Sequence, residues 1–439
     1  MFGYFTHERT DKKVRPSGNM KERFLYYLWE NRLLTGRLLT TAGQTVEVIN
    51  PGFRNTDSGP DYLEARINIG AQTWAGHVEI HVRTSDWNRH GHQTDKAYQN
   101  VVLHVVYEHD AAVNDIPVLE LKGRFDERLF NDYQRFMNAR GWIACERSIG
   151  QVQRFTLMSW LDRMAVERIE QKTEKVSKML SQRQYDWEDT LYRLLMRYFG
   201  MKVNNEAFEF LSNILPFKNL LKHTDQLTQL EAMLFGCAGF LERDFEEAYP
   251  LLLKREFNVM RSKFGLLMMP VERWKFLRMR PMNFPTVRLA QIAQMIHRNG
   301  CLFSIIKEAQ EVETVKTLFN VEASDYWNNH YRFENPSSQG GFQPKRLGDS
   351  MANVLVINAV APLLFCYGKL HKELSFCEKA LGFLEELPAE DNSVVRHFAQ
   401  CGIHAENAMQ TQGLLHSYSM YCKRKRCLEC PIGVTILQY

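Results

Sequence analysis

The stretch that decides the fold runs from Gly59 to His109 and reads GPDYLEARINIGAQTWAGHVEIHVRTSDWNRHGHQTDKAYQNVVLHVVYEH. Apolar and polar residues alternate over 63–69 and 74–82, which is the period of a half-buried β-strand. Six of the chain's 14 histidines lie between His77 and His109, among several carboxylates. Imidazoles and carboxylates gathered on short strands are the ligands that divalent metals require. This stretch therefore predicts a sheet and a metal site on it.

Segments on either side of this stretch extend the sheet and begin a helical region. Apolar spacing predicts a helix over 21–34, strands over 46–49, 101–107 and 118–121, and a short helix over 95–100. After about residue 150, helical patterns replace the strands, broken by a Gly-, Ser- and Pro-rich loop over 334–350. We therefore expect an α+β chain with an N-terminal mixed α/β sheet domain at 1–150, a helical domain at 151–330 and a C-terminal helical region at 351–439.

Length and composition are those of an ordinary globular protein and set limits on its partners. The 439 residues carry a formal net charge of only +4, so a basic surface for nucleic acid must be local. The longest apolar run, 352–367, contains Asn353, Asn358 and Pro362 and predicts a buried helix and not a membrane span. Since the first residues show no secretory pattern, we expect a cytoplasmic protein, without membrane contact, whose nine cysteines are reduced thiols or metal ligands.

Asp61 and Glu79 form the first candidate site. Asp61 follows a turn at the start of one predicted strand, whereas Glu79 and His81 share one face of the next, because side chains alternate along a strand. If the two strands pair through a turn at 70–72, the two carboxylates lie close together. Such a pair can hold Mg²⁺ or Mn²⁺, which would polarise a phosphate and lower the pKa of an attacking water.

These residues resemble the PD-(D/E)xK nuclease superfamily, in which a helix precedes a strand with the Asp and a following strand carries Glu-x-Lys. Pro60-Asp61 and Glu79-Ile80-His81 stand at the matching places. The resemblance implies a metal-dependent nuclease, with Glu30 on the leading helix as an accessory ligand. His81 replaces the usual Lys, and an imidazole is not a permanent cation near neutral pH. Lys122, in a second Glu-x-Lys at 120–122, is the candidate for that role.

The chain as a whole also resembles an uncharacterised bacterial family, domain-of-unknown-function family 2851. The resemblance rests on the segments 57–61 (DSGPD), 76–81 (GHVEIH), 85–87 (SDW), 90–92 (HGH) and 103–107 (LHVVY). It covers most of the chain and implies no known activity.

His90, His92 and Asp95 form a second candidate site on the loop after the Glu79 strand. The His-x-His spacing suits Zn²⁺ or Mn²⁺, and Asp95 adds an oxygen ligand. On the nuclease interpretation these residues assist the Asp61 and Glu79 site. On a rival interpretation His90 and His92, with His104, form the zinc site of a hydrolase. Since His104 lies on an otherwise apolar strand, we expect it to be a hydrogen-bonded core residue.

The C-terminal cysteines form a third candidate site. Cys422, Cys427 and Cys430 fall within nine residues, and Cys401 lies upstream as a possible fourth ligand. Four thiolates suit Zn²⁺ or a [4Fe–4S] cluster, and Pro431 after the last cysteine is typical of ferredoxin-like loops. The remaining cysteines stand among apolar neighbours and predict core thiols: Cys145, Cys237, Cys301, Cys366 and Cys377.

Basic residues interleaved with aromatic ones favour a nucleic-acid surface, with Arg278, Arg280 and Arg288 as its candidates. The same pattern is common on ordinary amphipathic helices. Together these features predict a metal-dependent, nuclease-like phosphodiester hydrolase that acts on nucleic acid. Two alternatives stay open: a non-enzymatic nucleic-acid-binding or scaffold protein with a structural cysteine site, and a zinc hydrolase that uses His90 and His92.

Overall fold

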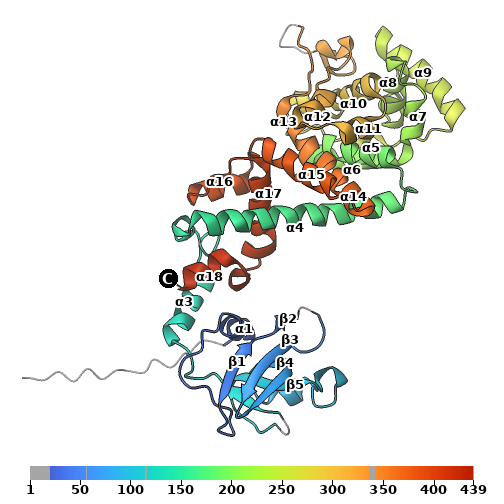
Figure 1. The fold of residues 1–439 in the computed structure, drawn as a ribbon. Helices are drawn as coiled ribbons and strands as arrows, with labels where there is room; N and C mark the ends of the chain where they lie inside the picture. Colours follow the sequence, from blue (N-terminus) through green and yellow to red (C-terminus); the bar gives the residue numbers. More distant parts are fainter. Residues whose placement is uncertain (1–19, 56, 114–115, 337–341, 439) are drawn as a thin grey trace, which may run out of the picture. The chain divides into compact units, whose positions relative to one another are not determined.

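The computed structural model describes residues 20–55, 57–113, 116–336 and 342–438. The chain divides into two compact units (Figure 1). Unit 1 contains the residues up to Leu157 together with Tyr418 onward, and unit 2 contains Met158–Ser417. Unit 1 is a mixed α/β unit and unit 2 is largely helical. The C-terminal region that we expected at 351–439 is thus divided between the two units.

Unit 1 is built on one sheet, in the order β1-β3-β4-β5-β6, with β2 paired to β3. Its strands are β1 (Val46–Asn50), β2 (Phe53–Arg54), β3 (Tyr62–Ile69), β4 (Gln72–Arg83), β5 (Val101–Glu108) and β6 (Val118–Glu120). The turn between β3 and β4 uses Gly70 at φ +61°, a left-handed conformation that glycine adopts at little cost. The expected hairpin of the Asp61 and Glu79 strands is therefore present, and β3 and β4 are antiparallel.

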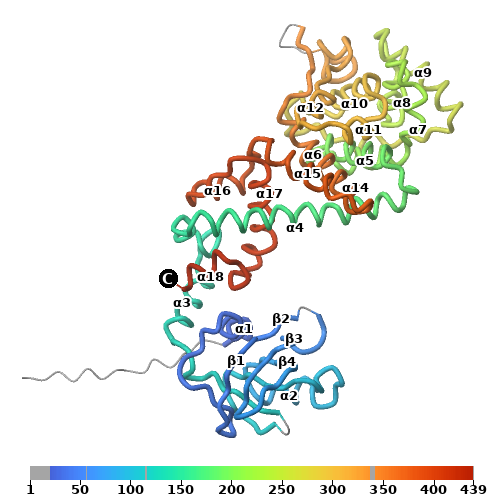
Figure 2. Tube along the Cα trace, viewed as in Figure 1, coloured from blue at the N-terminus to red at the C-terminus, as the bar shows by residue number. Residues whose placement is uncertain are grey.

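The pairing changes from antiparallel to parallel at β4: β4 and β5 are parallel, and so are β5 and β6. Parallel neighbours need a crossover connection. Here the crossover is residues 84–100, which include helix α2 (Asp86–Arg89) and the 3₁₀ turn η1 (Lys96–Tyr98). Helix α2 contacts β4, and Figure 2 traces it beside that strand. The crossover therefore brings the His-x-His loop to the strand that carries Glu79 and His81.

Helix α1 (Glu22–Glu30) contacts β4 and shares one core with the sheet, as Figure 1 shows in unit 1. Phe24, Leu25 and Leu28 are fully buried, and so are Val78 and Ile80 in the same core. Burial of one such side chain contributes about 1.5–3 kcal/mol to folding. Because side chains alternate along β4, Glu79 and His81 point to the opposite face of the sheet.

The remaining elements of unit 1 come from both ends of the chain. They are α3 (Glu127–Met137), the 3₁₀ turns η2 (Ile149–Gln151) and η8 (Cys427–Glu429), and α18 (Pro431–Gln438), which contacts α3. Helix α3 was not predicted from the sequence, although Asp126 caps it by accepting a hydrogen bond from the Arg128 amide. Helix α4 (Arg154–Ser181) begins in unit 1 and continues into unit 2.

Unit 2 is formed by helices and short turns. Its further helices are α5 (Trp187–Phe199), α6 (Met201–Ile214), α7 (Phe217–Leu221), α8 (Leu227–Cys237), α9 (Ala248–Phe264), α10 (Pro285–Asn299), α11 (Leu302–Glu308), α12 (Val312–Phe319), α13 (Asp349–Leu355), α14 (Ala361–His371), α15 (Leu374–Glu386), α16 (Ser393–Gln400) and α17 (Ala408–His416). Two π-helical turns, η6 (Val356–Val360) and η7 (Ser417–Cys422), follow α13 and α17, and η7 continues into unit 1. The 3₁₀ turns η3 (Val271–Arg273), η4 (Pro281–Asn283) and η5 (Asp325–Asn328) complete the helical elements.

One expectation for the helical region was wrong in detail. Strands do recur, as the small antiparallel pair β7 (His330–Arg332) and β8 (Asn335–Pro336). Within the C-terminal helical region, the helix is interrupted at 401–407, because Asn407 leaves the helical conformation and its side chain caps α17. The helical stretch Asp349–His371 is long and apolar enough to cross a membrane, and 78% of its most apolar window is buried inside the fold.

Candidate metal centre

Glu79 and His81 lie on the face of β4 opposite the α1 core. Their side chains are buried, although both are polar. In the parallel pairing Glu79 stands beside His104 of β5, so three titratable side chains share this face of the sheet. A buried polar side chain needs partners that compensate its lost hydration. The partners of these residues therefore define the site.

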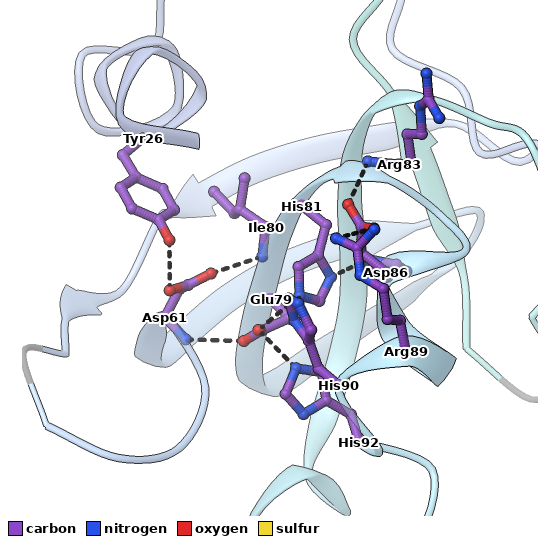
Figure 3. Close-up of polar contacts among 11 residues, drawn as sticks. Tyr26, Asp61, Glu79, Ile80, His81, Arg83, Asp86, Arg89, His90 and His92 are labelled. Atoms are coloured by element: carbon purple, nitrogen blue, oxygen red, sulfur yellow. Dashed lines mark hydrogen bonds and ion pairs between the residues drawn. The ribbon is translucent and has the colours of Figure 1, made fainter. Parts of the chain in front are cut away.

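The crossover loop supplies two further histidines to the same place (Figure 3). His90 Nδ1 lies 3.2 Å from His81 Nε2, and His92 Nε2 lies 3.3 Å from Glu79 Oε1. Glu79 Oε1 is also 3.3 Å from His81 Nε2. One nitrogen of each of His81, His90 and His92 lies within 4.8 Å of the other two. Three imidazole nitrogens therefore converge from a strand and the loop that follows it, with Glu79 Oε1 beside two of them.

The three histidines are spaced closely enough to hold one ion, and Glu79 Oε1 lies beside two of them. In a tetrahedral centre with bonds of about 2.0–2.1 Å, neighbouring ligand atoms stand about 3.3–3.4 Å apart. The three distances around His81 Nε2 and Glu79 Oε1 agree with that edge length. In addition, His92 Nε2 is buried and, within the described chain, has no aligned hydrogen-bond partner. An ion would satisfy that atom together with its neighbours.

Asp61 positions Glu79 and does not face the histidines. Its backbone amide donates to Glu79 Oε2 at 3.0 Å, which leaves the other oxygen, Oε1, directed at the imidazoles (Figure 3). The Asp61 carboxylate accepts from the Tyr26 hydroxyl at 2.8 Å and from the Ile80 amide at 2.9 Å. Both of its oxygens are thus hydrogen-bonded to the protein.

His104 fixes the orientation of the His81 ring through a hydrogen bond. Its Nε2 lies 2.9 Å from His81 Nδ1, so the two rings share a hydrogen bond and His81 Nε2 is left for the cluster. A metal-bound histidine commonly fixes its orientation through its second ring nitrogen in this way. The expectation that His104 is a hydrogen-bonded core residue is confirmed for Nε2, whereas its Nδ1 has no partner among the described residues. Trp87 packs against both His92 and His104, with ring centroids 5.3 and 5.2 Å away.

Burial sets the charge state of these groups. Burial and the neighbouring Asp61 charge raise the pKa of Glu79 to about 8. Burial and the nearby imidazoles lower the pKa of His81 to about 2 and that of His104 to about 3. Burial also lowers the pKa of His92. The imidazoles of His81, His92 and His104 are therefore neutral at physiological pH, the form that binds metal ions.

The helix α1 contributes residues that the sequence analysis assigned differently. Glu30, the expected accessory ligand, accepts from the Tyr62 hydroxyl at 2.9 Å and pairs with Arg54. Burial and the Asp61 charge instead raise the pKa of Glu22. Glu22, Tyr26 and Glu30 repeat every four residues, so the sequence placed all three on one helix face. This spacing of four residues could have predicted that Tyr26 lies beside Asp61, but the role of Tyr26 was not predicted from the sequence.

Two other predicted site residues lie elsewhere in unit 1. Lys122 follows β6 and is exposed, and its Nζ lies 2.5 Å from Glu108 Oε1. It is therefore paired at the sheet surface, and β5 separates its strand from Glu79. Asp95 is exposed and caps η1, because its side chain accepts from the Ala97 amide. Its charge nevertheless raises the pKa of His92 against the effect of burial.

The predicted nucleic-acid residues lie in unit 2 and differ in exposure. Arg278 and Arg280 are exposed near the η4 turn. Arg288 is buried in α10, where its guanidinium donates to Gln291 at 2.8 Å and Asn283 at 2.7 Å. Arg288 therefore satisfies internal hydrogen-bond acceptors, and its charge is not on the surface of unit 2.

The predicted cysteine ligands fall in both units. Cys422, Cys427 and Cys430 belong to unit 1, whereas Cys401 follows α16 in unit 2. Of the expected core thiols, Cys237, Cys366 and Cys377 are buried. The expectation was wrong for Cys301, which is exposed because it precedes α11 at the surface of unit 2. Cys145 is half-buried in unit 1.

Comparison with known proteins places the chain in one family. The model of a family described as "Protein of unknown function (DUF2851)" matches residues 22–393, so the chain belongs to that family. The match includes the sheet of unit 1, the histidine cluster and most of unit 2. No curated protein and no solved structure matches the chain.

Proposed function

We propose that this protein is a metal-dependent hydrolase whose ion is held by Glu79, His81, His90 and His92. The convergence of three imidazole nitrogens, with the Glu79 carboxylate oxygen 3.3 Å from two of them, carries the proposal. Three imidazoles favour a transition-metal ion such as Zn²⁺ or Mn²⁺ over Mg²⁺, which prefers oxygen ligands. The two sites proposed from the sequence, one of carboxylates and one of histidines, thus become one centre.

The surroundings of the centre suit hydrolysis. A bound ion would polarise the substrate and lower the pKa of a water molecule. Catalytic Zn²⁺ sites keep a position open and can take a fifth ligand, and Mn²⁺ can bind more than four, so an ion held here could also bind that water. His90 is exposed and His92 half-buried, so the centre opens to solvent on the loop side. Asp61, held by Tyr26 and Ile80, adds a fixed carboxylate beside Glu79.

A phosphodiester of nucleic acid is the substrate class that we propose. The order of elements supports it: α1 precedes β3, Asp61 stands at the mouth of β3, and Glu79 and His81 lie on the antiparallel neighbour β4. This is the order that characterises the PD-(D/E)xK superfamily. Arg89 could contact the phosphate of a substrate at the centre. Its side chain is exposed, and its charge is near enough to the centre to lower the pKa of His81. Its present partner is Asp86, at 2.6 Å.

The test measures cleavage by the full chain after chelation and reloading with Zn²⁺, Mn²⁺ or Mg²⁺. Substrates are single- and double-stranded DNA and RNA, with bis-p-nitrophenyl phosphate as a generic phosphodiester. We expect cleavage with Zn²⁺ or Mn²⁺ that is lost in Glu79→Gln and His90→Ala proteins. His77→Ala is the matched control, because His77 lies on the same strand outside the cluster.

Three outcomes would contradict parts of this proposal. Cleavage that survives in both variants would remove the cluster from catalysis. Tight metal binding without cleavage of any substrate would keep the metal centre and refute the hydrolase, in favour of a binding or scaffold protein. Cleavage of the generic ester but of no nucleic acid would keep the hydrolase and refute the substrate class.

A further inference from the structure

A second group of potential metal ligands lies in unit 1, away from the histidines, at the C-terminal end of the chain. Cys422 ends the π-helical turn η7, Cys427 begins η8, and Cys430 stands just before α18. Tight turns join them: the Lys425 amide donates to the Cys422 carbonyl at 3.1 Å, and the Cys430 amide to the Cys427 carbonyl at 3.3 Å. The backbone therefore folds the three cysteines into one compact knuckle.

The start of α18 closes on this knuckle. A Cβ atom on Gly433 would lie 2.2 Å from the Cys427 carbonyl oxygen, so only glycine allows the helix to come this close. The backbone amides of Gly433 and Ile432 donate to the Cys430 thiol and lower its pKa against the effect of burial. Amide donors aimed at a sulfur stabilise a thiolate, which is the form that binds metals.

A fourth cysteine lies in a segment of unit 1 that packs against these turns. Cys145 lies between α3 and η2, and two contacts tie this segment to residues 418–430. The Trp142 and Tyr418 rings stack with centroids 4.5 Å apart, and the Lys425 ammonium donates to the Met137 carbonyl at 2.7 Å. In Figure 2 the trace of α18 runs beside that of α3, in agreement with their contact.

The charges of these four cysteines influence one another, although no three of their sulfurs lie within 4.8 Å of one another. Burial raises the pKa of the Cys145 thiol, and Cys422, Cys430 and Cys427 raise it further, in that order. The Cys422 thiol is raised in the same way by burial, Cys430 and Cys427. All four are reduced thiols.

We propose that Cys145, Cys422, Cys427 and Cys430 together hold a thiophilic metal centre, either Zn²⁺ or an iron–sulfur cluster. Each thiol would release its proton to solvent as its sulfur–metal bond forms. Both centres use four thiolates. The fourth ligand is thus Cys145 and not Cys401, the residue nearer in sequence. The centre joins two segments of unit 1 that lie more than 270 residues apart in the chain.

The first test compares the metal content of the full chain with that of two single variants, Cys145→Ser and its matched control Cys401→Ser. All are purified without oxygen and supplied with zinc, or with iron and sulfide. We expect the parent and Cys401→Ser to carry the metal, and the content of Cys145→Ser to fall about tenfold or more. Zinc analysis and the visible absorption of an iron–sulfur cluster distinguish the two centres.

A second measurement uses the parent alone, so it does not depend on how the variants fold. The native protein is alkylated before and after metal removal, and the modified cysteines are identified by mass spectrometry. We expect Cys145, Cys422, Cys427 and Cys430 to be protected together and released together. Alkylation of Cys145 while the other three stay protected would overturn the proposal. So would loss of metal in Cys401→Ser but not in Cys145→Ser, or a parent that takes up neither metal.

Discussion

Metal affinity at the histidine centre is expected to rise with pH up to about pH 8 as Glu79 loses its proton. The carboxyl group, with its pKa raised to about 8, must lose a proton before it binds an ion. His81, with its pKa lowered to about 2, is already neutral and contributes no such competition. The deprotonated fraction of Glu79 rises from about a tenth at pH 7 to about a half at pH 8. The apparent affinity should therefore rise about fivefold over that interval.

The assay is a titration of the chelated protein with Co²⁺ or Mn²⁺, followed by calorimetry, at several pH values from 7 to 8. The Glu79→Gln protein should bind more weakly by about tenfold or more at pH 8 and lose the dependence on pH. Glu47→Gln is the matched control, because Glu47 is exposed on β1 of the same sheet. A parent whose affinity is constant between pH 7 and pH 8, or a Glu79→Gln protein that keeps the slope, would refute the assignment of Glu79.

Three further changes probe other parts of the structure. Tyr26→Phe removes the hydroxyl that donates to Asp61, which should cost about 1–2 kcal/mol of unfolding free energy in urea titrations; an unchanged midpoint would contradict this. Lys122→Ala should leave hydrolysis unchanged because Lys122 is exposed and paired outside the centre, and a loss above about tenfold would restore it as a catalytic residue. Gly236→Ala should destabilise unit 2 by about 1–3 kcal/mol, since the new Cβ would lie 2.1 Å from a phenylalanine of α9. Gly382→Ala is the control, because a Cβ there would meet open space. Equal thermal midpoints for the two variants would contradict that packing.

The sequence predicted the sheet well because the period of two is a local signal. The strands around Glu79 and the helix before them follow directly from alternating and helical spacing. The same period placed Glu79 and His81 on one face. It did not show that His90 and His92 join them, because that depends on the parallel pairing of β4 and β5 and on the path of the crossover between them.

Contacts between residues far apart in the chain leave no local signal in the sequence. Cys145 stands among apolar neighbours in the sequence, so only the packing of α3 and α18 brings it to the other cysteines. Arg288 sits in a basic and aromatic pattern, yet its helix faces the interior of unit 2. Burial of a single cation depends on the acceptors that surround it, and those acceptors have no periodic signature.

The discontinuity of unit 1 has a consequence for how the protein is made. Leu437 and Val434 pack with the α1 and sheet core, so that core is complete only when the last residues of the chain are present. About 260 residues of unit 2 must be synthesised first, which takes roughly 10–50 s at ribosomal speed. During that time the sheet of unit 1 lacks the packing of α18 against its core. A chain truncated near residue 417 should therefore depend on chaperones, although unit 2 itself would be fully translated.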